Sequence, residues 1–348
     1  MSALAKQVES REGNGGLEMS ASRSCPVCAS QAISHFGDGQ DRLFGLAEGT
    51  FTLLRCNLCK CIFQSPLPDE ASIARYYPDS YWWAGEAASD SQIPSLLSRL
   101  ERIYREFVAS DHLRFLESCA KPGGSHGRSL LDIGCGSGTF IYLASRRGYS
   151  VCGMDVSATA VRLARDLYGV DARQGDVGSA VWPGQKFDFV TMFHVLEHLP
   201  DPAGALGYAA SLLTPGGSLI VQVPNVDSIQ ARLFGMRWYG LDVPRHLINF
   251  SHAGLRLLLE RGGFGIVRKA RFSLRDDPAA LASSFAMCLD PIGRKARLRG
   301  GNALWEAAAE LLYFALVAVA VPLAWIEGMM GKGATIWVMA RHNGLPRR

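Results

Sequence analysis

The segment Leu130–Thr139, which reads LLDIGCGSGT, constrains the fold of this chain more than any other. An apolar run ends in Gly134, Gly136 and Gly138, and residues with helical spacing follow, which predicts a strand, a tight turn and a helix. Glycines in such a turn let a small polar ligand approach the unpaired N–H groups at the start of the helix. A dinucleotide-binding turn would need its third glycine at position 139, where this chain has Thr139, so the spacing argues against NAD or FAD.

Three more strands are expected after this turn, and each is followed by a polar residue. They are Tyr149–Met154 before Asp155, Asp171–Gln174 before Gly175 and Asp176, and Phe187–Phe193 before His194. Because the carboxyl ends of parallel strands meet at one edge of a sheet, these residues and the glycine turn are expected to share one crevice. An acid in the position of Asp155 commonly accepts hydrogen bonds from the two hydroxyls of a ribose, so the ligand is expected to contain a nucleoside.

Four ordered segments resemble the class I S-adenosylmethionine-dependent methyltransferases. They are LDIGCGSG at 131–138, the acid at 155, GD at 175–176, and FDFVTMFHVLEHLPDP at 187–202 followed by LTPGGSLIVQVPN at 213–225. The resemblance spans roughly 113–342. It implies an α/β fold with a doubly wound, seven-stranded, mostly parallel Rossmann-like sheet, and S-adenosylmethionine as the methyl donor.

By this resemblance, nine residues would form the donor site. They are Asp132, Gly134, Gly136, Gly138, Asp155, Val156, Asp176, Val177 and His194. The backbone around the first two glycines would hold the methionine part, Asp155 the ribose and Asp176 the adenine amino group, with the two valines lining the ring. Two roles have plainer alternatives, because Gly138 also suits close helix packing and Asp176 also suits a turn.

Two C-x2-C pairs form the second strong motif, and they predict a closed, structural zinc site with four thiolate ligands. The ligands are expected to be Cys25, Cys28, Cys56 and Cys59, with Cys61 as an alternative to the last. Reduced knuckles or a redox pair would be the other explanation, but a thioredoxin-like βαβ context is missing here. The polar segment Met1–Ser24 has no apolar signal run, which favours a reducing cytoplasm.

These motifs divide the chain into five expected regions. They are a disordered tail (1–22), a zinc-binding module (23–68), an aromatic and helical connector (69–125), a methyltransferase domain (126–273 plus 333–342) and a hydrophobic helical insert (274–332). The connector holds YYPDSYWW at 76–83 and helix-spaced apolar residues over 95–119, and it is expected to join the module to the sheet rather than to act as a lid. The order of knuckles, PLP turn and YYPDSYW is similar to methyltransferases of sugar and polysaccharide biosynthesis.

Methyl transfer to a hydroxyl needs orientation and a general base, and histidine is the natural candidate. His194 and His198 follow the fourth strand, and His246 lies in DVPRHL, where the family builds its substrate side. Two of them have a plainer role as well, because His194 would also suit a contact to the donor and His198 would also suit a cap or local packing. All three are therefore predicted as candidate catalytic residues.

The uncharged run Leu311–Ile326 is the unusual feature of the C-terminal part. It is shorter than the roughly 20 residues that span a bilayer, and Pro322 interrupts it, so it is not expected to cross. Its flanks, Phe264–Phe272 and Thr335–Arg341, are expected to be the last two strands. With the basic residues Arg294, Lys295, Arg297 and Arg299 upstream, region 304–326 suits peripheral contact with the inner face of the membrane. A buried helix and an oligomer contact are equally open alternatives.

The overall charge of the chain does not select the substrate. The net charge of +4 is mild and spread along the sequence, so nucleic-acid binding is not required by it, and a local basic patch stays open. The predicted reaction is methyl transfer from S-adenosylmethionine to a small-molecule, sugar or lipid-linked (glycolipid) acceptor, on oxygen because the C-terminal domain of the sugar C-methyltransferases is missing. The alternatives are a ribosomal RNA methyltransferase and a non-catalytic scaffold of the same fold.

Overall fold

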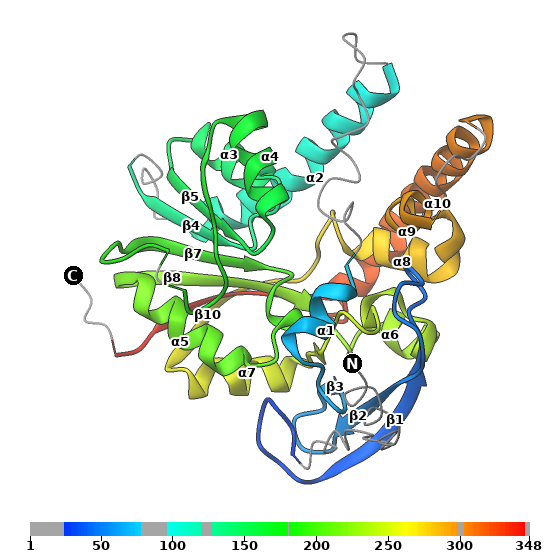
Figure 1. Ribbon diagram of the computed structural model, residues 1–348, viewed down its shortest axis with the longest axis horizontal. Helices are drawn as coiled ribbons and strands as arrows, with labels where there is room; N and C mark the ends of the chain where they lie inside the picture. The colour runs from blue at the N-terminus through cyan, green and yellow to red at the C-terminus, as the bar shows by residue number, and fades with distance from the viewer. Residues whose placement is uncertain (1–23, 78–95, 120–126, 180, 298–302, 345–348) are drawn as a thin grey trace, which may run out of the picture.

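The computed structural model describes residues 24–77, 96–119, 127–179, 181–297 and 303–344. The predicted disordered tail and most of the aromatic run 76–83 lie outside this part of the chain. Figure 1 shows the described elements as a central sheet with helices on both sides and a smaller sheet near the N-terminus.

The central sheet has seven strands in the order β10-β11-β8-β7-β4-β5-β6. Their bounds are β4 Ser129–Ile133, β5 Ser150–Asp155, β6 Asp171–Gln174, β7 Phe187–Phe193, β8 Leu213–Pro224, β10 Phe264–Ala270 and β11 Thr335–His342. The first five along the chain run parallel to one another, whereas β11 runs antiparallel to both β8 and β10. The predicted seven-stranded, mostly parallel sheet is therefore confirmed.

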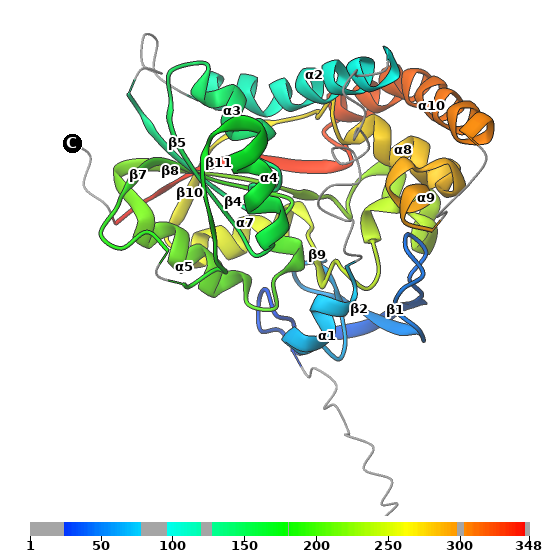
Figure 2. The same ribbon diagram turned by 45° about the horizontal axis from the view of Figure 1, so that its top comes forward.

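Helices cover both faces of the sheet, as Figures 1 and 2 show. The helices are α1 Glu70–Arg75, α2 Leu96–Cys119, α3 Thr139–Ser145, α4 Ala158–Tyr168, α5 Pro202–Leu212, α6 Ile229–Phe234, α7 His252–Arg261, α8 Asp277–Phe285, α9 Pro291–Arg297 and α10 Ala303–Met329. Short 3-10 turns are η1 Leu196–His198, η2 Gly235–Arg237, η3 Tyr239–Leu241 and η4 Met287–Leu289. One apolar cluster joins α2, α3 and α4 to the sheet, and another joins α5 and α7 to its opposite face.

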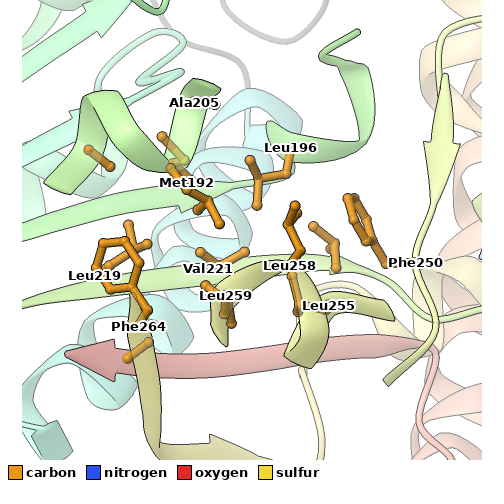
Figure 3. Close-up of a cluster of buried hydrophobic side chains, with 14 of the residues drawn as sticks. Met192, Leu196, Ala205, Leu219, Val221, Phe250, Leu255, Leu258, Leu259 and Phe264 are labelled. Atoms are coloured by element: carbon orange, nitrogen blue, oxygen red, sulfur yellow. The ribbon is translucent and has the colours of Figure 1, made fainter. Parts of the chain in front are cut away.

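The second cluster shows why these segments fold where they do. Met192 and Val221 project from β7 and β8 toward Leu255 and Leu259 of α7, with Phe264 closing the cluster (Figure 3). All five side chains are almost fully buried, and each buried aliphatic or aromatic side chain contributes about 1.5–3 kcal/mol. Parallel strands are covered by helices on both faces, and this is why their residues are apolar almost without interruption.

Local caps set where several helices begin. The side chains of Ser157, Asp201 and Ser251 accept hydrogen bonds from backbone N–H groups in the first turns of α4, α5 and α7. Each cap of this kind stabilises a helix by about 1 kcal/mol. The caps of α4 and α5 place the starts of these helices just after β5 and β7 along the chain.

A second, antiparallel sheet has the order β1-β2-β3-β9, with β1 Ile33–Gly39, β2 Phe51–Cys56, β3 Ile62–Gln64 and β9 Ile248–Asn249. The first three strands belong to the predicted zinc-binding module, but β9 comes from the region between β8 and β10. Ile62 pairs with Asn249, and the N–H of Gln64 donates to the carbonyl of Leu247 at 2.9 Å. The N-terminal module therefore shares a sheet with the chain that carries His246.

The expectation that Pro322 interrupts the apolar run is wrong. α10 continues through this proline to Met329, and Leu304–Met329 has the length and apolar composition of a membrane-spanning helix, with 28% of its most apolar stretch buried. Packing explains the continuity: Ala309, Tyr313 and Val317 lie against residues of α8 and η4. These contacts offset the one backbone hydrogen bond that a proline removes.

The flanks of α10 behave as expected, because β10 and β11 are neighbours and Ala270 pairs with Trp337. The expectation that Arg294 belongs to an exposed basic cluster upstream of α10 is wrong. Its side chain is 3% exposed, donates to the carbonyl of Glu306 at 3.0 Å and lies 3.9 Å from a carboxylate oxygen of Glu310. Arg297 is exposed, whereas Arg299 and the side chain of Lys295 fall outside the described part of the chain.

Candidate functional site

The residues that follow the parallel strands meet at one edge of the sheet, as the sequence predicts. Ile133 pairs with Met154 and Met192, and Asp155 pairs with Gln174, so the carboxyl ends of β4, β5, β6 and β7 are adjacent. The glycine turn, the acid after β5, the Gly-Asp pair after β6 and the histidine after β7 therefore lie around the same crevice region that α/β folds use for ligands.

The glycine turn is tied to Asp155. The N–H of Gly136 donates to Oδ2 of Asp155 at 2.9 Å, and the N–H of Ser157 donates to Oδ1 at 2.9 Å. Gly136 has φ +52°, and a Cβ there would meet nothing within 4 Å, so its backbone faces open space. Gly138 has φ +85°, and its Cβ would lie 2.8 Å from Ala164 of α4. Gly136 thus suits ligand approach, whereas Gly138 suits helix packing.

Two carboxylates lie behind the turn. Asp155 is 2% exposed, and burial raises its pKa. Both of its oxygens accept one backbone hydrogen bond, and each keeps a second lone pair that can accept from a hydroxyl. Burial also raises the pKa of Asp132 to about 7, although the hydroxyl of Thr191 donates to it. A cationic group of a bound donor would favour the ionised form of Asp132.

The remaining donor residues of the prediction are at the open side of this edge. Val156 is 59% exposed, Asp176 is exposed and Val177 is half-buried. A large exposed apolar side chain beside a buried acid is the arrangement expected where a flat ring rests on the protein. The roles of these three residues toward the adenine stay predictions.

His194 lies in a buried network of charges at the end of β7. It has φ +55°, a conformation that costs a non-glycine residue energy and that clusters at functional sites. Its Nδ1 lies 3.0 Å from Oε1 of Glu197, and its Nε2 lies 3.5 Å from Oδ2 of Asp276. Burial opposes protonation, but the Asp276 and Glu197 carboxylates raise the pKa of His194 to about 10. At neutral pH this raised pKa favours the imidazolium form of His194. A protonated ring can position a ligand or stabilise negative charge, but it cannot act as a general base.

His198 and His246 approach the same Glu197 from another side. Their rings are 4.7 Å apart between centroids and nearly perpendicular. Burial, together with the neighbouring His246, lowers the pKa of His198 to about 4. Glu197 is fully buried, and burial opposes its ionisation, but His194 holds its pKa below the usual range. The structure thus gathers all three predicted catalytic histidines around one buried carboxylate.

Known methyltransferases share sequence with much of this chain. A family model described as a methyltransferase domain matches residues 100–269. The ubiquinone biosynthesis O-methyltransferase of Rhodopseudomonas palustris is 30% identical over 233 residues, which cover 62% of this chain and 87% of that protein. This chain belongs to the S-adenosylmethionine-dependent methyltransferase family. The resemblance read from its glycine turn and strand ends is confirmed at that level.

Two further relatives are matched over a smaller share of their length. Proteins of the same name from Alkalilimnicola ehrlichii and Klebsiella pneumoniae are 39% and 30% identical over 110 and 169 residues, which cover 30% and 46% of this chain. The chain spans only about half the length of these relatives, 44% and 63% respectively. Magnesium protoporphyrin IX methyltransferase from Synechocystis PCC 6803, with bound SAH, aligns at 20% identity and a TM-score of 0.43, over 58% of this chain and 92% of that chain.

Three residues of this methyltransferase site escape sequence reasoning. His112 of α2 lies 2.7 Å from Oε1 of Gln222, whose Nε2 donates to Asp276 at 2.7 Å. Asp276 in turn pairs with His194 and belongs to the predicted hydrophobic insert, so the insert takes part in the site. Gln222 is a polar residue inside an apolar strand, which is a signal that the sequence offers, whereas only packing brings His112 and Asp276 to it.

The cysteine pairs of the methyltransferase come together as four buried thiols. Sγ of Cys25 lies 3.6 Å from Sγ of Cys59, and Sγ of Cys28 lies 3.4 Å from Sγ of Cys56. These separations exceed the ~2.05 Å of a disulfide and are close to the ~3.8 Å between thiolates around a tetrahedral zinc ion. Sγ of Cys61 lies instead 3.9 Å from Oγ of Ser251. The geometry fits zinc and favours Cys59 over Cys61.

Proposed function

We propose that this protein transfers the methyl group of S-adenosylmethionine to an oxygen of a small hydroxylated acceptor. The strongest support is that the glycine turn, Asp155 and Glu197 follow neighbouring parallel strands at one edge of the sheet. His198 and His246 lie close to Glu197 there. Several relatives are named O-methyltransferases of ubiquinone biosynthesis, which supports oxygen as the accepting atom. A sugar or glycolipid is the acceptor class that the N-terminal motifs favour.

The reaction needs few groups from the protein. An acceptor oxygen attacks the methyl carbon in line with the carbon–sulfur bond, the bond breaks with its electron pair on sulfur, and the acceptor proton leaves to water. Asp155 would hold the ribose, and the turn at Gly136 would hold the methionine part. His198 and His246 are the neighbouring groups placed to hydrogen-bond the acceptor hydroxyl and orient it for attack, whereas His194 is held as a cation.

Labelled methyl donor and separated cell fractions test this function. Incubation of the full chain with cell extract should place label in the small-molecule, lipid or glycan fraction, and the carbon chemical shift of the transferred methyl should be that of an O-methyl ether. Label in RNA would replace this proposal with RNA methylation. Binding of the donor with no label in any fraction would favour a scaffold.

We also propose one structural zinc ion on Cys25, Cys28, Cys56 and Cys59. Metal analysis should return about one zinc per chain at this site, because four thiolates close its coordination shell. Cys59→Ser should lose the zinc and destabilise the N-terminal sheet, whereas Cys61→Ser should keep the metal. Retention of full metal in Cys59→Ser with loss in Cys61→Ser would reverse the assignment.

We propose further that α10 rests on the cytoplasmic membrane surface. One side of the helix packs on α8, and the other exposes a long apolar stripe: Leu304, Leu311, Leu312, Val319, Leu323 and Ile326, each at least half exposed. Figure 1 shows α10 running outward from the sheet. Because β10 and β11 are adjacent, both ends of the insert return to the same side, which favours lying in the interface over crossing it.

The triple variant Leu312→Glu, Val319→Glu and Leu323→Glu should therefore lose sedimentation with liposomes while keeping its fold. The buried apolar area drives most of this binding, and each exposed basic residue adds only about 1 kcal/mol, so salt should release the wild type only in part. Leu167→Glu with Val267→Glu is the matched control, because both side chains are half-exposed elsewhere. Wild-type protein that stays in solution at low salt would contradict the proposal.

A further inference from the structure

A second group of potential metal ligands lies next to the glycine turn, apart from the cysteines. A carboxylate oxygen of Glu197 and one ring nitrogen each of His198 and His246 all lie within 4.8 Å of one another. Ligands around a divalent ion with bonds of about 2.1 Å lie about 3–4 Å apart, so small side-chain adjustments close this shell. We propose that Glu197, His198 and His246 bind one divalent transition-metal ion, which takes the acceptor hydroxyl as a further ligand.

The hydrogen bonds of both rings select the nitrogen that would bind the ion. Nδ1 of His198 lies 3.0 Å from the carbonyl oxygen of Arg245 and 2.8 Å from the hydroxyl of Tyr77, and Nδ1 of His246 lies 2.8 Å from the carbonyl oxygen of Gly240. A carbonyl oxygen only accepts and a hydroxyl oxygen can also accept, so a proton on each Nδ1 satisfies these contacts and leaves the lone pair on each Nε2. Metal-binding histidines in proteins are oriented in this way, by a carbonyl or carboxylate on the other nitrogen.

Glu197 supplies the observation that is independent of the histidines. Its side chain is fully buried, and among the described residues its Oε2 has no hydrogen-bond partner. A buried carboxylate oxygen without a partner costs free energy that a bound cation would recover. His194 occupies only Oε1, at 3.0 Å. The site therefore has the charge, the ligand atoms and an unsatisfied oxygen for a cation.

The ligand set indicates an ion that takes part in chemistry. Two imidazoles and one carboxylate suit zinc, iron, cobalt or nickel ions and leave coordination positions open, unlike the closed shell of four thiolates. Given the proposed methyl transfer, on which this role rests, an acceptor hydroxyl in an open position would lose its proton to water at neutral pH. The resulting oxygen would attack the methyl carbon as the carbon–sulfur bond breaks. Acceptors with two neighbouring oxygens, which can fill two open positions, fit best.

Cobalt titration of the zinc-loaded full chain tests the site. Cobalt bound by nitrogen and oxygen lacks the thiolate charge-transfer absorption that exchange into the cysteine site would produce. We expect one equivalent to bind without that absorption, and His246→Ala to weaken binding at least about 100-fold. His252→Ala is the matched control, because this half-buried histidine contacts Asn225 outside the cluster and should bind cobalt like the wild type.

X-ray absorption of cobalt-loaded wild-type protein adds a test that needs no variant, and two imidazole ligands with oxygen should appear. Equal cobalt affinity in His246→Ala and the wild type, or thiolate ligands alone, would overturn the inference. Methyl transfer by a metal-free chain would also overturn it while leaving the proposed function intact. Cobalt binding with the expected ligands, but no methyl transfer to any fraction, would support the site and count against the proposed function.

Discussion

Asp155→Ala should lower the affinity of the protein for S-adenosylmethionine at least about 100-fold. Two hydrogen bonds from ribose hydroxyls to a carboxylate contribute about 1.5–3 kcal/mol each, and every 1.4 kcal/mol is tenfold in affinity. The variant also leaves the N–H of Gly136 without its acceptor, which loosens the turn that would hold the methionine part. Calorimetric titration of wild type and variant with the donor measures the change, and NADH should bind neither form.

Two controls separate the ribose contact from general damage. Asp155→Asn keeps an oxygen for Gly136 but loses the charge, so its donor affinity should fall between those of the wild type and the alanine variant. Asp166→Ala removes an exposed acid on α4 and should leave donor binding unchanged. Donor affinity that is equal in Asp155→Ala and the wild type would rule out this acid as the ribose ligand.

Arg245→Ala should lower the free energy of unfolding by about 3–5 kcal/mol, because it leaves buried carboxylates without their cation. The Arg245 side chain is fully buried, and its Nη2 lies 2.9 Å from Asp41 and 2.6 Å from Asp242. Its Nη1 also donates to the carbonyl of Tyr76, and its guanidinium lies 4.5 Å above the ring of Phe44. One side chain therefore joins the N-terminal module and the connector to the loop before His246. Urea unfolding measures the loss.

Arg256→Ala is the surface control, since its ion pair with Glu260 is exposed and should be worth no more than about 1 kcal/mol. Arg245→Lys keeps the charge but loses the fork that binds two carboxylates, so its stability should lie between wild type and Arg245→Ala. Equal unfolding free energies for Arg245→Ala and Arg256→Ala would show that the buried triad does not tie the modules together.

If Arg245→Ala unfolds the N-terminal sheet, the zinc ion proposed for Cys25 and its partners should be lost at lower urea concentration than in the wild type. The shared strand pairing of Ile62 with Asn249 predicts this coupling, because both modules contribute to one sheet. Parallel metal and fluorescence measurements during unfolding would detect it.

Local patterns in the sequence were enough for the central sheet. Strands Asp171–Gln174 and Phe187–Phe193 have the predicted bounds. The second is an apolar run of the kind that marks a buried parallel strand. The glycine turn and Asp155 were predicted for the same reason, since neighbouring residues along the chain define them. The four thiols also followed from spacing alone, and their separation of 3.4–3.6 Å agrees with it.

Contacts between distant residues could not be predicted in this way. Arg245 meets Asp41, and Asp276 meets His194, only because separate elements pack side by side, and no local period encodes which polar residues will face each other. The length of α10 was misjudged because a proline signal is local, whereas packing on α8 decides whether the helix continues. The sequence by itself thus determined the sheet, the family and the cysteine site, all set by short-range spacing. Only the tertiary structure decided that three histidines gather around Glu197, because burial of that carboxylate depends on the whole fold.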